Sequence, residues 1–557
     1  MGARGLPEGR YLSCTTFLHP DAGGQTRALL MRNAAFHEEA GICPEILSFM
    51  PAGDFPQRRR LLRERGLLHP ELTVRNIFDH YREHPWRSLR STGRGLTDLS
   101  RHQVDEELRA DGSPWRVSYR DPTARARVHD YLRADGTTYL RTRSYRVGVP
   151  RTWHTPLLAV NPDGEVAGSF ATPAEWSRHW VGDLLHEDEP AFVFIDARAL
   201  VLHLAPLREP NVHLLYVMHN MHLQPPRRWD SATVGSYGAI LNRAADLDAL
   251  VTLTERQRED IAQRVGATSN LFVVPNPVHV PEPPPEVTRD PRQVAVVARL
   301  EPQKRVRDAV RVFARVVAAV PDARLEVFGT GREEPLLRDV VRRRGLSESV
   351  TLRGFDPHAR DALWRSSALL LTSAFEGYPL TTLESMSRGC PVVSYDVKYG
   401  PREQITDGVD GFLVPDGDLD AAADRVVELL GSPDLVARMS AAAVAEAHRH
   451  GIDRFLEDWA HVLHTVVEQK PRRTDLSRLR HRVREYAAQD GQLGGQPGEL
   501  RVTVTVRGPI RATTALRTAR VELALVDETT GEVRDLPAEV QRDWRGLRVT
   551  STCPEPS

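Results

Sequence analysis

Residues 369–396, LLLTSAFEGYPLTTLESMSRGCPVVSYD, contain the signals of a strand, a loop, a helix and a second strand. The apolar run 368–371 has the length of a buried parallel strand. We expect a loop over 373–379, a helix from Leu380 to about Gly389, and a strand over 391–395. Such a unit is typical of a doubly wound α/β sheet, in which ligands bind at the carboxyl ends of the strands.

Two carboxylates, Glu376 and Glu384, flank this loop. Gly377 permits close backbone approach, and the start of the following helix offers free N–H groups to an anion or a sugar hydroxyl. Thr381-x-x-Glu384 also fits a capping box, and Glu376 could be an ordinary solvated acid. Because the two acids occur together just past a buried strand, we favour a functional pair.

Composition limits the class of protein. A chain of 557 residues predicts two to four domains, and its formal charge of −1 provides no global field that would recruit nucleic acid or a membrane. The N-terminus lacks the apolar core of a signal peptide, and no apolar run reaches the length of about 18 residues that a membrane helix needs. Four scattered cysteines suit a reducing compartment. We therefore expect a soluble cytoplasmic protein, with peripheral association at the inner face of the membrane left open.

The pattern along the chain predicts four regions. Residues 1–66 and 186–285 form a first α/β domain, interrupted over 67–185 by an antiparallel β insertion whose alternating strands lie at 115–119, 127–133, 137–147, 155–160 and 165–170. The Pro-rich stretch 281–291 predicts a linker into a second α/β domain, which we place over 286–470. Residues 471–498 predict a helix and a linker before a small β appendage that extends to residue 557. We expect the insertion to support acceptor binding or a homo-oligomer.

Other candidate residues follow predicted strands. Arg299 and Lys304 lie at the end of strand 294–300 and in the next loop, where two cations could neutralise a diphosphate leaving group in place of a metal. They could also be surface charges. The Gly23–Gly24 turn could admit a phosphate or a sugar, or could be a plain tight connection.

A histidine pair follows the predicted strand 213–218. His219 or His222 could contact a sugar hydroxyl, and the alternative is a buried histidine that bonds to the backbone. No third metal ligand is apparent in this stretch, and we expect no metal site.

Together these residues resemble the retaining glycosyltransferases of family 4, which have the GT-B fold of two Rossmann-like domains facing across a cleft. The family's Arg…Lys pair matches VARLEPQKR, its Glu-x7-Glu pair matches FEGYPLTTLE, its Gly-rich loop matches residues 22–25, and its strand-end histidine matches His219. A narrower resemblance, in the β insertion and in residues 395–401, is to poly(glycerol-phosphate) and poly(ribitol-phosphate) α-glycosyltransferases and the serine-rich-protein GlcNAc transferase. Pro379 departs from these narrower relatives but fits the wider family.

The resemblance implies a role for each candidate residue. Arg299 and Lys304 would bind the diphosphate of the donor, Glu376 would lie near the transferred sugar, Glu384 would hold the ribose, and His219 would contact the sugar's far hydroxyl. The donor would also be lined by Gly23, Gly24 and the backbone of Gly377, Tyr378, Pro379, Leu380 and Thr381. The acceptor hydroxyl would attack from the face that the phosphate leaves, without a metal or other cofactor.

The resemblance predicts transfer of glucose or N-acetylglucosamine from a UDP-sugar to a polyol-phosphate polymer of the teichoic-acid type. A serine-rich protein, a lipid or an exopolysaccharide is the alternative acceptor. Two other functions stay open: a GT-B sugar-nucleotide epimerase, which needs no acceptor, and a non-catalytic partner of an active transferase.

Overall fold

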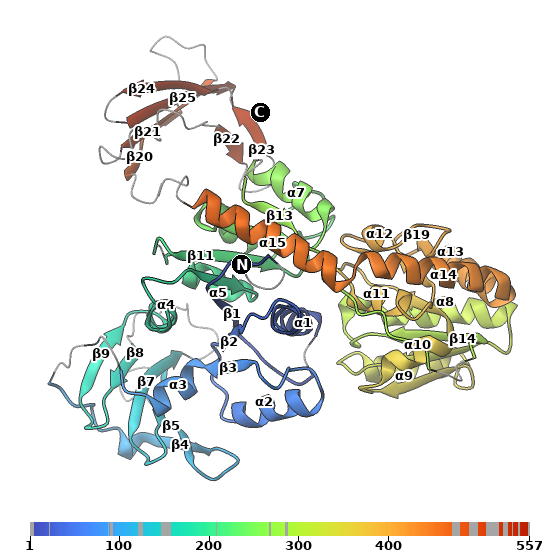
Figure 1. Cartoon of the computed structure of the whole chain (residues 1–557), viewed down its shortest axis with the longest axis horizontal. Coiled ribbons are helices and arrows are strands. Elements are labelled where there is room, and N and C mark those ends of the chain that lie inside the picture. Colours follow the sequence, from blue (N-terminus) through green and yellow to red (C-terminus); the bar gives the residue numbers. More distant parts are fainter. Residues whose placement is uncertain are drawn as a thin grey trace. The chain divides into compact units, whose positions relative to one another are not determined.

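The computed structural model describes residues 5–470 except 22, 87–88, 90–92, 121–125, 146–156, 208, 267–268 and 285–287, and beyond them the backbone of six strands. By internal contacts the chain forms two units. One comprises Met1–Met221, Ala249–Arg258 and Leu271–Leu463, and the other comprises His222–Asp248, Glu259–Asn270 and His464–Ser557. The first unit contains two parallel sheets and the β insertion (Figure 1).

The N-terminal sheet has seven parallel strands in the order β13-β12-β11-β10-β1-β2-β3. Its strands are β1 (Arg10–Thr15), β2 (Glu45–Ser48), β3 (Thr73–Asn76), β10 (Ala191–Ile195), β11 (Val212–Met218), β12 (Ala249–Thr252) and β13 (Leu271–Val273). The helices of this region are α1 (Gly24–Glu38), α2 (Phe55–Glu64), α3 (Ile77–Glu83), α4 (Pro173–Leu184), α5 (Arg198–Leu204), α6 (Tyr237–Leu241) and α7 (Glu255–Val265). Every residue of β10 and β11 is buried, which explains their unbroken apolar sequences.

The C-terminal sheet has six parallel strands in the order β16-β15-β14-β17-β18-β19. Its strands are β14 (Asp290–Val297), β15 (Arg324–Phe328), β16 (Val350–Gly354), β17 (Ser366–Leu371), β18 (Val392–Tyr395) and β19 (Gly411–Val414). Its helices are α8 (Val306–Ala319), α9 (Glu334–Arg343), α10 (Ala362–Arg365), α11 (Leu380–Met386), α12 (Pro401–Gln404), α13 (Leu419–Gly431) and α14 (Pro433–Arg449). Strand β14 begins inside the predicted linker and ends before Arg299, so Arg299 lies in the loop after the strand.

The insertion is a six-stranded antiparallel sheet in the order β4-β5-β6-β7-β8-β9. Its strands are β4 (Gln103–Leu108), β5 (Pro114–Arg120), β6 (Ala126–Leu132), β7 (Thr138–Tyr145), β8 (Leu157–Val160) and β9 (Val166–Phe170). Sequence alternation predicted all of them except β4, whose residues are nearly all exposed. Strand β3 lies within 67–185 but pairs with β2, so the N-terminal sheet includes it.

Aromatic side chains join the insertion to helices α3 and α4. The ring of Phe78 on α3 lies 4.8 Å from Tyr131 on β6 and 4.9 Å from Trp176 on α4, measured between ring centroids. The side-chain oxygen of Asn76 accepts a hydrogen bond of 2.9 Å from Phe78 N, which caps α3 where β3 ends.

Helix α15 (Ile452–Gln469) returns from the C-terminal sheet to the N-terminal one. Its Trp459 is almost fully buried, and its ring lies 5.2 Å from Phe194 and 6.1 Å from Phe36. These contacts tie the end of the second domain to α1 and β10 of the first.

Beyond residue 470 the structure describes β20 (Arg480–Ala488), β21 (Glu499–Arg507), β22 (Leu523–Val526), β23 (Val533–Leu536), β24 (Ala538–Asp543) and β25 (Gly546–Pro554). They form an antiparallel sheet, β20-β21-β25-β24, and a hairpin, β22-β23. The helix predicted within 471–498 is wrong over 480–488, because these residues pair with β21 along their length. Among the described residues, no helix has the length and apolar character needed to cross a bilayer.

Candidate functional site

A cavity of about 910 Å³ lies where strands of both parallel sheets end. Twelve of the candidate residues predicted from the sequence line it: Gly23, Gly24, His219, Arg299, Lys304, Glu376, Gly377, Tyr378, Pro379, Leu380, Thr381 and Glu384. Ala22 lies outside the described residues, and His222 is fully buried away from this lining. Residues that the sequence separates by more than three hundred positions thus meet in one cavity.

Glu376 is held by two donors in the loop between β17 and α11. Its Oε1 atom accepts hydrogen bonds of 2.5 Å from Lys304 Nζ and 2.5 Å from Ser373 Oγ. The backbone of Glu376 is also fixed, because its N–H donates to Lys398 O at 3.0 Å and its carbonyl accepts from Tyr399 N at 2.9 Å. The residue is 5% exposed, so its orientation is well defined and it is not an ordinary solvated acid.

Within the described part of the chain, Arg299 is the cation of this cavity that has no acidic partner. Among the described residues its guanidinium forms no ion pair, in contrast to the Lys304 ammonium. A Cβ atom at Gly23 would lie 3.4 Å from Arg299 Nε, which places the guanidinium beside the Gly-rich loop. Gly23 is the N-cap of α1 and provides no side-chain cap, so a free cation and the start of a helix meet at one place. This combination suits an anion such as a diphosphate.

Glu384 bridges two arginines from different domains. Its Oε1 lies 2.7 Å from Arg27 Nη2 on α1, and its Oε2 lies 2.9 Å from Arg360 Nε, in the turn that precedes α10. The capping-box alternative is wrong, because the N-cap of α11 is Pro379 and no side chain caps this helix. The carboxylate faces the cavity with its charge compensated.

His219 belongs to a buried charged cluster. Its Nε2 lies 2.8 Å from Asp196 Oδ1, and Asp196 also accepts hydrogen bonds of 2.9 and 2.6 Å from Arg32. Burial alone would raise the pKa of Asp196, but the Arg32 charge and the His219 hydrogen bond outweigh it and lower that pKa to about 2. An ionised carboxylate only accepts, so Nε2 of His219 carries a proton. The Nδ1 atom is buried without a partner among the described residues.

The backbone of Gly377 lies in close contact with the backbone carbonyl of His219, a residue of the first domain. A Cβ atom at this position would lie 1.9 Å from His219 O, which real contacts exclude. The group that approaches Gly377 is thus a carbonyl of the first domain, and the approach of a ligand to this backbone stays a prediction.

Sequence reasoning missed Asp196, Arg27 and Arg360. Asp196 comes directly after β10, so the strand-end argument applied to His219 could have found it. No local pattern indicated Arg27 or Arg360, because their pairing with Glu384 depends on how helix α1 and the second domain pack.

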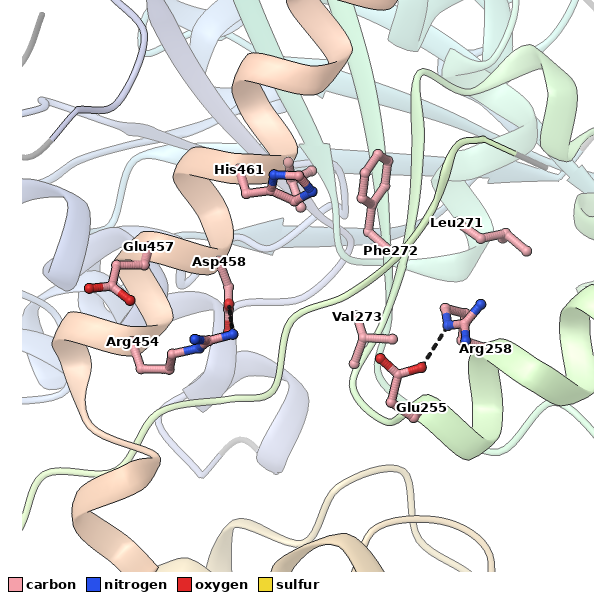
Figure 2. Close-up of a pocket in the computed structure, with 10 residues that line it drawn as sticks. Glu255, Arg258, Leu271, Phe272, Val273, Arg454, Glu457, Asp458 and His461 are labelled. Atoms are coloured by element: carbon pink, nitrogen blue, oxygen red, sulfur yellow. Dashed lines mark hydrogen bonds and ion pairs between the residues drawn. The ribbon is translucent and has the colours of Figure 1, made fainter. Parts of the chain in front are cut away.

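A second, smaller cavity of about 510 Å³ lies between α7, β13 and α15 (Figure 2). Four of its charged side chains form two ion pairs, with 2.7 Å between Arg258 Nε and Glu255 Oε2 and 2.9 Å between Arg454 Nη2 and Asp458 Oδ1. No residue predicted from the sequence lines it. The larger cavity is the candidate functional site.

Comparison with known proteins matches residues 283–445 to the family described as "Glycosyl transferases group 1". The poly(glycerol-phosphate) alpha-glucosyltransferase of Bacillus subtilis (strain 168) is 26% identical over 309 residues, which are 55% of this chain and 46% of that protein. The poly(ribitol-phosphate) alpha-N-acetylglucosaminyltransferase of Staphylococcus aureus (strain COL) is 25% identical over 227 residues, 41% of this chain and 46% of that one. The chain thus spans about half the length of these curated relatives.

A solved structure shows the same architecture. The crystal structure of a mutant of S. aureus TarM in complex with fondaparinux, alpha-GlcNAc-glycerol and UDP superposes with a TM-score of 0.63 at 18% sequence identity. The superposition covers 82% of this chain and 100% of that chain. Two parallel sheets with an antiparallel insertion are therefore common to both. The chain has the GT-B fold, and its residues 283–445 match the family Glycosyl transferases group 1.

Proposed function

We propose that this protein is a retaining hexosyltransferase that moves glucose or N-acetylglucosamine from a UDP-sugar to a hydroxyl of a polyol-phosphate polymer of the teichoic-acid type. The observation that carries the proposal is the pairing of Lys304 with Glu376, at 2.5 Å, in the cavity that also contains Arg299, which pairs with no acid among the described residues. The two relatives named above, which transfer sugars to poly(glycerol-phosphate) and poly(ribitol-phosphate), support the choice of acceptor.

The cavity suits this chemistry step by step. Arg299 and Lys304 would bind the diphosphate and stabilise the charge that grows when the bond from the anomeric carbon to the phosphate oxygen breaks. Glu376 would face the positive charge that develops on the sugar. The acceptor oxygen would form the new bond from the same face, and its proton would pass to the departing phosphate. To bind the diphosphate at the start, Lys304 would exchange its contact with Glu376 for one with the leaving group.

The first test measures release of UDP from UDP-glucose and UDP-N-acetylglucosamine, with and without poly(glycerol-phosphate). Release that needs one sugar and the polymer supports the proposal. Release without the polymer retains the donor chemistry but contradicts this acceptor and favours a protein, lipid or exopolysaccharide. Epimerised UDP-sugar, or no reaction with any donor, contradicts the proposal in favour of an epimerase or a non-catalytic partner.

Substitution of the paired charges tests the site itself. Lys304→Ala and Glu376→Gln should each lower turnover by roughly 100-fold or more, because each removes a charge placed for the transition state. Lys470→Ala is the matched control, since Lys470 pairs with Asp248 at 2.9 Å outside the cavity. Wild-type turnover in either cavity variant, with the control unchanged, would contradict the assigned site.

A further inference from the structure

Arg305 is the single residue between the turn that carries Lys304 and helix α8. The turn is a short 3-10 helix, Pro302–Lys304, and α8 begins at Val306. Arg305 has a φ of 44° and a ψ of 40°, which is the left-handed region that residues with a Cβ atom disfavour. It is one of two non-glycine residues with a positive φ among those that the structure describes. Such a conformation persists only where surrounding contacts hold it, and it is common at functional sites.

The side chain of Arg305 makes contacts that a glycine could not make. Its Nη2 atom donates a hydrogen bond of 3.0 Å to Ser373 O and is also paired with Asp416. Its guanidinium carbon lies 5.2 Å from the centroid of the Tyr395 ring, at the end of β18. The side chain is 27% exposed, and Arg305 is not among the residues that line the large cavity. It therefore supports the loops of the cavity from behind.

The segment 303–305 is joined to the segment 372–375, which follows β17. Four polar contacts connect them besides that of Arg305 with Ser373: Thr372 Oγ1 with Lys304 O at 3.2 Å and with Arg305 O at 3.1 Å, Ala374 N with Gln303 O at 2.7 Å, and Gln303 Nε2 with Phe375 O at 3.0 Å. Thr372 and Ser373 are buried. The two segments therefore hold each other at a fixed separation.

The two charges of the candidate site belong to these joined segments. Glu376 Oε1 accepts hydrogen bonds of 2.5 Å from Lys304 Nζ and 2.5 Å from Ser373 Oγ. Ser373 thus has two roles, because its carbonyl accepts from Arg305 while its hydroxyl donates to Glu376. A continuous chain of polar contacts leads from the Arg305 guanidinium to the Lys304–Glu376 pair.

We propose that Arg305 is a positioning residue that sets the separation of the Lys304 ammonium and the Glu376 carboxylate without contacting the substrate itself. The inference rests on the proposed function, in which Lys304 stabilises the leaving diphosphate and Glu376 faces the positive charge on the sugar. Both charges act only where they are aligned with the bond that breaks, and a displacement of about 1 Å can cost on the order of 100-fold in rate. A guanidinium suits this role, because its rigid fork donates to two acceptors at once.

Arg305→Gly separates the effect of the side chain from that of the backbone. Glycine adopts the left-handed conformation without steric cost, so α8 should keep its start while the guanidinium contacts are lost. Turnover should fall about tenfold or more, and Arg305→Lys, which keeps the charge but not the fork, should recover part of it. Arg315→Ala is the matched control, because Arg315 lies on α8 in a surface ion pair with Asp420. The control should keep turnover within about twofold of wild type, and thermal melting checks that each variant is folded.

A double-mutant cycle shows whether Arg305 acts through Lys304. It compares the turnover of wild type, Arg305→Gly, Lys304→Ala and the variant that carries both substitutions. The loss caused by Arg305→Gly should shrink to about twofold or less when Lys304 is absent, because no ammonium remains to be placed. A merely structural role of Arg305 would give the same loss in both backgrounds. That result, or wild-type turnover in Arg305→Gly, would overturn the inference.

The lysine signals give a second readout, which needs no turnover. The sequence contains only three lysines, Lys304, Lys398 and Lys470, so isotopic methylation of the amines gives few NMR signals, which substitution of each lysine assigns. Arg305→Gly should move the Lys304 signal towards that of a freely solvated lysine and leave the signal of Lys470, which pairs with Asp248, in place. A Lys304 signal that does not move would overturn the inference. Absence of wild-type turnover would contradict the proposed function, and the lysine signals would then decide this inference by themselves.

Discussion

At the scale of the residue, His219 in the cavity wall is held by charged side chains that are buried away from solvent. Arg32 is 3% exposed, and its guanidinium donates to both oxygens of the fully buried side chain of Asp196. Asp196 in turn accepts a hydrogen bond from Nε2–H of His219, and this bond fixes the histidine tautomer and the orientation of its ring. The contact predicted between His219 and a sugar stays a prediction, and its Nδ1 atom is the one that the structure leaves without a partner among the described residues.

The cluster predicts that Asp196→Asn destabilises the protein by about 3 kcal/mol at neutral pH, because Arg32 would stay buried without a counter-charge. The pKa of Asp196 is lowered to about 2 in the folded protein. Its contribution to stability is therefore complete above the unfolded pKa of about 3.9 and is lost as the pH falls towards 2. Denaturant unfolding should give a large difference in the free energy of unfolding between wild type and variant at pH 7, and a smaller difference at pH 3.

Asp420→Asn is the control for this prediction, because Asp420 is 78% exposed in a surface ion pair with Arg315. Its effect should stay below about 1 kcal/mol. An equal loss in both variants, or a gap for Asp196→Asn that does not change with pH, would contradict the assignment of a buried ionised carboxylate.

At the scale of the element, the unit β17–loop–α11–β18 has the order that the apolar runs predicted. Its strands, Ser366–Leu371 and Val392–Tyr395, are buried throughout. The local sequence also predicted a helix from Leu380, and α11 begins there. The contacts of the loop could not be predicted in the same way, because the carbonyl that faces Gly377 comes from a residue 158 positions earlier in the chain.

Gly377→Ala should separate the loop from His219, since the new Cβ atom would lie 1.9 Å from a carbonyl oxygen. We expect a loss of at least about 2 kcal/mol of stability or a displaced loop, with UDP-sugar turnover nearly abolished. Gly431→Ala is the control, because nothing lies within 4 Å of a Cβ atom there and the residue ends α13. Thermal melting and turnover of both variants check the prediction, which wild-type activity of Gly377→Ala would refute.

At the scale of the whole molecule, the cavity needs both parallel sheets. The family match covers residues 283–445 only, yet 16 of the 36 residues that line the cavity precede residue 277. Strands β20–β25 pair only with one another among the described strands, and every residue that lines the cavity precedes residue 385. The C-terminal strands therefore belong to a part of the molecule distinct from the candidate site.

A chain that ends at Lys470 should bind UDP with an affinity within about twofold of the full chain, because the truncation removes no strand of either parallel sheet. This variant retains the Lys470–Asp248 ion pair of 2.9 Å. Calorimetric titration of UDP into the shortened and the full chain, after circular dichroism confirms folding, makes the comparison. Loss of UDP binding by a folded, shortened chain would show that the C-terminal strands contribute to the site.

The sequence by itself determined the two α/β domains, most strands of the insertion and a set of residues at the carboxyl ends of strands. Apolar runs, alternation and turn residues are local signals, and the strand-end rule converts them into positions such as Arg299, Lys304 and Glu376. Only the tertiary structure decided that Arg27 pairs with Glu384, that Asp196 holds His219, and that β3 joins the N-terminal sheet. These contacts join residues far apart in the chain, and their partners are chosen by how helices and sheets pack, which no local pattern encodes.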